Sequence, residues 1–173
     1  MHAIANGPAA SSHPGSAASI NALGSRLVAT GHEIAPLLAR VALGIVMFPH
    51  GAQKMLGWYG GHGFAGTVGF MSGKLGIPVV FAVLAIAAEF LGSLGLLVGA
   101  LSRVAAFGIA VVMLVAIAMV HGNVGFFMNW TGAQQGEGYE YHLLALGLAF
   151  VVMVRGAGAY SVDRMWATRK RAP

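Results

Sequence analysis

The chain contains four long apolar segments separated by short polar or glycine-rich stretches, and this pattern constrains its fold more than any other feature. They lie near residues 36–57, 78–100, 103–121 and 141–156. At about 1.5 Å per residue, each of the first three reaches across most of a ~30 Å hydrocarbon core. The fourth is shorter, and it needs flanking tyrosines as interfacial anchors or a thin part of the bilayer. The pattern predicts an all-α integral membrane protein with a four-transmembrane-helix bundle over residues 34–163.

The composition agrees with this class. Hydrophobic residues make up 57% of the 173 residues and charged residues only 9%, so there is too little polar surface to cover a water-soluble globule. The chain has no cysteine, which excludes a disulfide framework, a thiolate metal site and a dithiol relay within it. Any redox role must then use a bound cofactor or a partner.

Two tracts flank the apolar segments. Residues 1–33 are rich in Ala, Ser, Gly and Pro and have no sustained apolar period, which predicts a disordered tail. No basic start precedes an apolar core of about 7 to 15 residues there, so this tract is not expected to be a signal peptide. Residues 164–173 form a basic tail, whose charge is expected to attract anionic lipid headgroups.

The basic residues are distributed unequally between the two sides of the predicted bundle. With four spans, eight of the ten Lys and Arg residues fall on the side that holds both termini, and only Lys54 and Lys74 fall on the other. Because cytoplasmic segments carry the excess of basic residues, both termini are predicted to be cytoplasmic, with loops 57–77 and 121–140 facing outward. Orientation thereby accounts for the formal charge of +5, and nucleic acid is not an expected partner.

The first outer loop carries the pattern of a short helix. Its apolar residues recur at i, i+4, i+7 and i+11 and form one stripe: Phe64, Val68, Met71 and Leu75. Such a helix is expected to lie along the outer interface as a lid, or only to connect the first two spans. Between the second and third spans, residues 99–102 predict a tight hairpin.

Polar residues inside the predicted spans mark a candidate site. With His121, Glu140 and His142 at the outer ends of the third and fourth spans, they predict a polar shaft that opens on the outer face and ends at the buried Glu89. His50 lies roughly 10 Å and Glu89 roughly 16 Å below the outer boundary, whereas Lys54 is only about 5 Å deep. A lone carboxyl near the bilayer centre costs a few kcal/mol unless it is protonated or paired, so it usually faces the bundle interior. Glu89 is therefore the main candidate for a functional group, the alternative being a protonated carboxyl that only joins helices. Its expected partner is His50, whose depth is closer, while Lys54 is expected to snorkel outward.

The residues around His50 indicate what such a site would bind. Pro49 removes a backbone hydrogen bond, and the resulting kink is expected to turn His50 into the bundle, with Gln53 and Lys54 on the same face. An imidazole, an amide and a buried carboxyl together can hydrogen-bond the carbonyl oxygens of a quinone and exchange protons with it. The alternative is a histidine that only satisfies the freed carbonyl. Haem or metal ligation is not expected, because no His-x-x-x-His or Glu-x-x-His pair shares a helix face.

Several motifs, in order along residues 36 to 163, resemble the DoxX family (DoxX/DoxD-like) of small bacterial inner-membrane proteins. The motifs are Arg40 to Gly44, Pro49-His50-Gly51, Gln53-Lys54, Leu75 to Pro78, Ala88 to Gly92, His121-Gly122, Gly138 to Tyr141, and Tyr160 to Asp163.

The resemblance implies a four-helix bundle in the bacterial inner membrane that acts in an oxidoreductase system, quinone-linked in some relatives. Glu89 and His50, the most deeply placed polar residues, are the candidate catalytic groups. The positions that match the family's motifs are the candidate cofactor-binding residues: His50, Gln53, Lys54, Glu140 and Tyr141. A soluble or membrane redox partner, and a homo-oligomer, are compatible with it. Two alternatives remain, a non-catalytic scaffold for redox-defence proteins and a small proton-linked permease.

Overall fold

The computed structural model describes Ala29 and residues 33–169, and this part of the chain contains helices and no strands. The longer helices are α2 (Ile34–Leu56), α4 (Val79–Val98), α5 (Ser102–Ala116) and α6 (Glu140–Arg155). The shorter ones are η1 (Trp58–Gly60), α3 (Gly63–Gly73), η2 (Ile117–His121) and α7 (Val162–Arg169). Of the predicted tail at residues 1–33, all but Ala29 and Glu33 lies outside the described residues, as do residues 170–173 of the basic tail.

Within the described residues, three helical stretches are long and apolar enough to cross a membrane. They are Ile34–Leu56, Val79–Val98 and Ser102–His121, the last formed by α5 and η2 together. The prediction of an all-helical membrane protein is confirmed to this extent. Helix α6 follows the fourth apolar segment but has only 16 residues.

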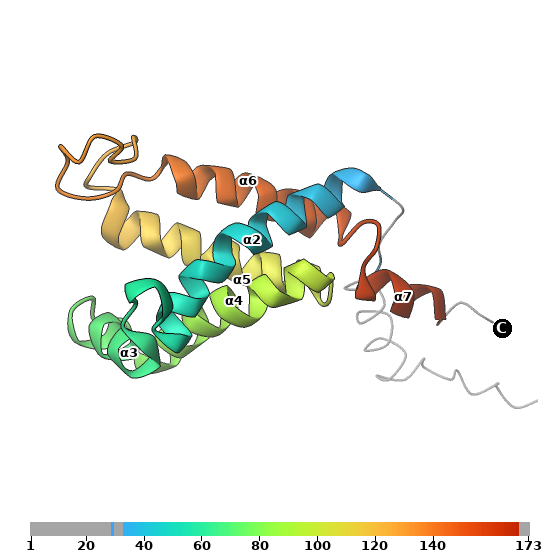
Figure 1. Cartoon of the computed structure of the whole chain (residues 1–173), viewed down its shortest axis with the longest axis horizontal. Coiled ribbons are helices and arrows are strands. Elements are labelled where there is room, and N and C mark those ends of the chain that lie inside the picture. Colours follow the sequence, from blue (N-terminus) through green and yellow to red (C-terminus); the bar gives the residue numbers. More distant parts are fainter. Residues whose placement is uncertain (1–28, 30–32, 170–173) are drawn as a thin grey trace, which may run out of the picture.

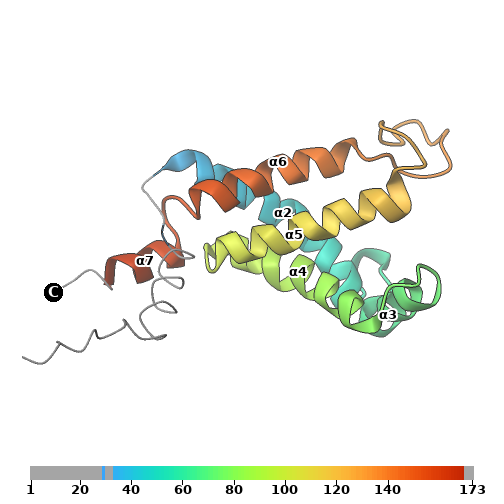
Figure 2. The same cartoon turned by 180° about the vertical axis from the view of Figure 1, so that it is seen from behind.

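The four longer helices form one bundle (Figures 1 and 2), in which α4 packs between α2 and α5, and α6 packs against both α5 and α2. The buried core includes Leu43 and Met47 of α2, Leu96 of α4 and Ile109 of α5. Outward-facing side chains are also large and apolar; Leu144 is 72% and Phe150 65% exposed. An apolar exterior around a packed core is what a bilayer, rather than water, requires.

The bundle has two distinct ends (Figure 1). Helix α3 and residues 122–139 lie at one end, which we call the loop end. The turn between α4 and α5, together with α7, lies at the opposite end, which we call the turn end. The turn is as tight as predicted, because α4 ends at Val98 and α5 begins at Ser102. Gly99, with a φ of 72°, ends α4 in the left-handed conformation that glycine adopts without strain.

The predicted helix in the first outer loop is present as α3, which packs against α2 and α4. Its buried residue is Thr67, while Phe64 of the predicted stripe is exposed and Leu75 falls beyond the helix end. That α3 lies at a membrane interface stays a prediction.

The last turn before the second loop is wound differently from the rest of the span. Residues of η2 form a π-helical turn, and the Gly122 N–H donates to the Ile117 carbonyl over 2.7 Å. Single π-helical turns inside longer helices are frequent at functional sites. This turn ends at His121, at the loop end of the bundle.

Candidate functional site

The Pro49–Lys54 stretch lies where α2 crosses α4 most closely. A Cβ atom added to Gly51 would lie only 2.6 Å from the backbone nitrogen and Cα of Phe90, so only glycine allows this approach. The crossing brings the last turn of α2 over Glu89, the residue before Phe90. Glycine at position 51 is thus required for helix packing, and the close crossing that it allows sets the position of the buried Glu89 carboxyl.

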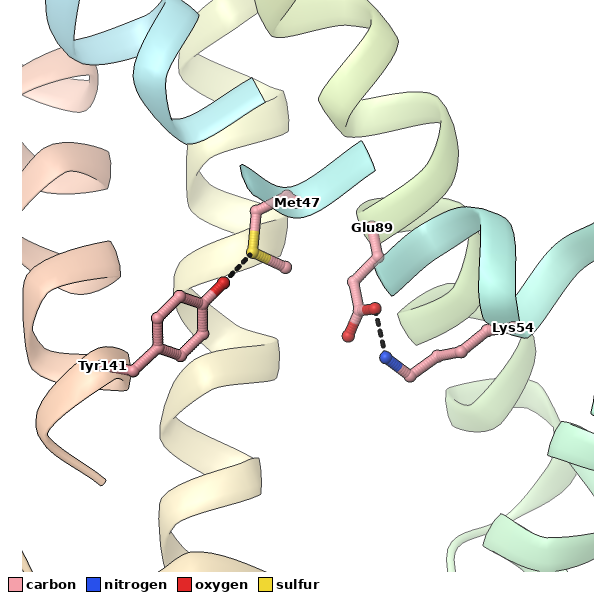
Figure 3. Close-up of polar contacts among 4 residues, drawn as sticks. All are labelled: Met47, Lys54, Glu89 and Tyr141. Carbon is pink, nitrogen blue, oxygen red and sulfur yellow. Dashed lines mark hydrogen bonds and ion pairs between the residues drawn. The ribbon is translucent and has the colours of Figure 1, made fainter. Parts of the chain in front are cut away.

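Glu89 forms an ion pair with Lys54 (Figure 3). The Glu89 side chain is only 2% exposed, and that of Lys54 is 28% exposed. The Glu89 carboxylate is therefore enclosed by the bundle, and the Lys54 ammonium reaches it from a partly exposed position. A charge this deeply buried persists only when it is paired or neutralised.

The expectation that His50 would partner Glu89 and that Lys54 would point outward was wrong. Depth along the membrane normal placed His50 closer to the carboxyl, but it neglected how far a side chain reaches. The long lysine stem runs back from the last turn of α2, and the close crossing at Gly51 puts Glu89 within its range.

His50 lies instead between α2 and α6. It is exposed, and its ring centroid is 5.8 Å from that of Tyr141. The Tyr141 hydroxyl donates to the Met47 sulfur over 3.3 Å (Figure 3), so this tyrosine ties the start of α6 to the middle of α2. Both residues stand near the Lys54–Glu89 pair without bonding to it.

The row of rings continues from Tyr141 across the bundle. The Tyr141 and His142 centroids are 5.4 Å apart, and those of His142 and His121 are 4.2 Å apart. The His121 Nδ1–H donates to the Glu137 carbonyl over 2.7 Å, because a carbonyl oxygen can only accept. The π-helical turn thus presents His121 directly to α6.

His142 is the least satisfied polar side chain of this row. It is 6% exposed, and its buried Nδ1 has no hydrogen-bond partner among the residues that the structure describes. An unsatisfied buried polar atom calls for an explanation, because it costs about 1–3 kcal/mol. His121 and His142 were expected at the outer mouth of the polar shaft, but they were not among the predicted catalytic or cofactor-binding residues.

The other two predicted cofactor-binding residues hold loops. Gln53 donates from Nε2 to the Tyr59 carbonyl over 3.3 Å. Glu140 accepts hydrogen bonds from the Met128 N–H and the Trp130 indole, over 3.0 and 3.1 Å. Their roles toward a cofactor stay predictions.

A second polar cluster lies at the turn end and was not predicted, because Arg40 was expected only as a cytoplasmic charge and part of a family motif. Arg40 is 1% exposed, and its guanidinium donates five hydrogen bonds to backbone carbonyls. The acceptors are Leu96, Leu97, Ala157, Ala159 and Tyr160. The arginine therefore joins the start of α2 to the end of α4 and to the segment after α6.

Asp163, at the start of α7, completes the cluster. Its carboxylate accepts from the Leu101 and Ser102 N–H groups over 2.7 and 2.9 Å, which satisfies the free donors at the start of α5. The acid is 2% exposed. Because the partners of Arg40 and Asp163 are backbone groups of three neighbouring segments, this cluster fastens the turn end.

Metal ligands do not gather at either end. Within the described residues, no three His, Asp or Glu side chains lie close enough together to hold a metal ion.

Comparisons with known proteins identify a family and one relative. The model of the DoxX family matches residues 35–122, just over half of the chain. The inner membrane protein YqjF of Escherichia coli (strain K12) is 29% identical over 133 residues, which cover 77% of this chain and 92% of that protein. No solved structure matches the chain.

Proposed function

This chain belongs to the DoxX family, and from that membership and the site geometry we propose that it is the quinone-facing membrane component of an oxidoreductase system. The protein lies in the bacterial inner membrane, because YqjF is an inner membrane protein and the chain has apolar helices of spanning length. Electrons come from a redox partner, soluble or membrane-bound, because the chain has no cysteine to relay them.

The proposal includes α6 as a fourth span. Its 16 residues rise about 24 Å, and Tyr139 at its start supplies an interfacial anchor. Four spans put both termini on one side, and the distribution of Lys and Arg makes that side cytoplasmic. The loop end, with α3 lying along the interface, then faces outward.

The observation that supports quinone chemistry most directly is the buried Lys54–Glu89 pair beside a row of histidines and a tyrosine. Reduction of a quinone to a quinol takes two electrons and two protons. Lys54 can donate a hydrogen bond, and then its proton, to one carbonyl oxygen of a bound quinone, and Glu89, once protonated, can return a proton to the lysine amine. His50, exposed at the edge of the site, can exchange protons with the outer surface.

Mild-detergent purification followed by organic extraction and mass spectrometry tests the proposal. We expect stoichiometric quinone with the wild type and its loss from Glu89→Gln. Glu137→Gln is the matched control, because that exposed carboxylate lies in the second outer loop and only accepts from the Asn129 N–H. Its quinone content is expected to equal that of the wild type. Wild type without quinone would contradict the proposal and favour the scaffold or the permease.

A further inference from the structure

An apolar groove runs along the seam between α5 and α6. Its volume is about 480 Å³, and all its lining residues are apolar, among them Phe107 and Leu114 of α5 and Leu146 and Phe150 of α6. Phe107, Leu114 and Phe150 are each more than half exposed, so the groove opens toward the surroundings of the bundle. Such a groove can bind an apolar hydrocarbon chain, but its shape alone does not identify the molecule that carries the chain.

One end of the seam is polar. His142 precedes Leu146 by four residues, so the two side chains lie on the same face of α6, one turn apart. The ring of His142 meets that of His121 across the same pair of helical segments, α6 and the extension of α5. His142, whose buried Nδ1 has no hydrogen-bond partner among the described residues, thus lies one helical turn beyond the Leu146 end of the groove.

We propose that this seam is the binding site of an isoprenoid quinone, with the head at His142 and the first part of the tail in the groove. This inference rests on the proposed function and deepens it, because it assigns a tail site and a second contact for the head. Neutral imidazole serves both redox forms: a ring N–H donates to a quinone carbonyl, and a ring nitrogen accepts from a quinol hydroxyl. Binding would satisfy the atom that the protein leaves unpaired.

The chemistry of the groove separates a quinone from a phospholipid. A phospholipid head carries a phosphate, which calls for a cationic partner. No Lys or Arg lines the groove, and the polar groups at its end are two imidazoles. The uncharged head of a quinone needs only hydrogen bonds. From Leu146 to Met153 the groove follows α6 for roughly 10 Å, so the rest of a long tail extends into the bilayer.

Gly147 offers a direct test, because it lines the groove and a Cβ atom there would meet nothing within 4 Å. Gly147→Leu fills the groove without disturbing the helix packing. Gly69→Leu is the matched control, since Gly69 is also helical and open but lies in α3, away from the seam. His142→Leu removes the polar contact, and His142→Gln keeps a hydrogen-bonding side chain.

The measurement is equilibrium binding of two probes to the purified proteins: a benzoquinone without a tail, and the same benzoquinone with two isoprene units. We expect the wild type and Gly69→Leu to bind the tailed probe roughly tenfold or more tightly than the tailless one. In Gly147→Leu this preference should fall to about unity, while affinity for the tailless probe stays unchanged. His142→Leu should weaken both probes, and His142→Gln should recover part of the loss.

The failures of the two proposals are distinguishable. If quinone is lost from Glu89→Gln but Gly147→Leu keeps the tail preference, this tail site is overturned and the proposed function stands. If the wild type binds neither probe, both are overturned. Release of a phospholipid, rather than quinone, on filling the groove would also overturn the assignment of the seam.

Discussion

At the scale of single residues, the bundle buries charge in two different ways. Glu89 has one cationic partner that reaches it from a more open position, whereas Arg40 is enclosed by five neutral carbonyls. The Glu89 carboxylate thus depends on a single partner, whereas the Arg40 guanidinium is held by five. The two sites therefore respond differently to substitution.

Lys54→Met is expected to lower the free energy of unfolding by about 2 kcal/mol, because it leaves the Glu89 carboxylate buried without its cation. The double variant Lys54→Met with Glu89→Leu should recover most of that loss, since no charge then remains inside. Thermal unfolding in detergent, arranged as a double-mutant cycle, measures the coupling. Equal stability of wild type and Lys54→Met would contradict the pairing.

Arg40→Lys should cost about 2–4 kcal/mol although it keeps the charge. A lysine offers three donors on a single nitrogen, which cannot meet five carbonyls that a planar guanidinium reaches. Arg155→Lys is the control, because Arg155 is exposed and its ion pair with Glu33, at 3.1 Å, is a surface contact expected to be worth under about 1 kcal/mol. A similar fall in melting temperature for both variants would show that Arg40 has no special role.

At the scale of helices, the crossing of α2 and α4 determines the geometry of the candidate site. Gly51 lets the two backbones meet, and the Lys54–Glu89 pair follows from that approach. The π-helical turn has the corresponding effect at the other seam, where it presents His121 to α6. The close helix crossing and the π-helical turn are both features of the backbone. The sequence motifs mark where they occur but do not show their geometry.

Gly51→Ala should force the two helices apart, because the new methyl would lie 2.6 Å from the Phe90 backbone. We expect a destabilisation of about 2–3 kcal/mol together with loss of bound quinone. Gly69→Ala should be neutral or stabilising by up to about 1 kcal/mol, because its Cβ meets open space in a helix. Calorimetry and quinone content of the two variants provide the comparison; an unchanged Gly51→Ala protein would refute the close crossing.

At the scale of the whole molecule, the sequence predicted helices better than it predicted contacts. Apolar runs of spanning length mark helices directly, and Gly99 marks the hairpin between α4 and α5. Depth along a helix does not give the reach of a side chain, so the partner of Glu89 was misassigned. The acceptors of Arg40 include carbonyls 117 to 120 residues away, and no local pattern points to them. The orphaned Nδ1 of His142 is likewise a property of packing alone.

The proposed orientation can be tested on the whole chain, because the absence of cysteine makes any introduced thiol unique. Gln135→Cys lies in the second outer loop and Thr168→Cys in α7, and both positions are exposed. A membrane-impermeant maleimide should label Gln135→Cys in intact spheroplasts and Thr168→Cys only after lysis. Labelling of both before lysis would contradict four spans, and the reverse pattern would contradict the orientation.

The contacts of Arg40 also impose an order on biogenesis. Arg40 enters the membrane with the first helix, but three of its acceptors are in residues 157–160, which the ribosome makes more than a hundred residues later. Until they arrive, the guanidinium lacks these partners and needs water or lipid phosphate in their place. The burial of Arg40 is therefore completed only after residues 157–160 have been made and packed against α2.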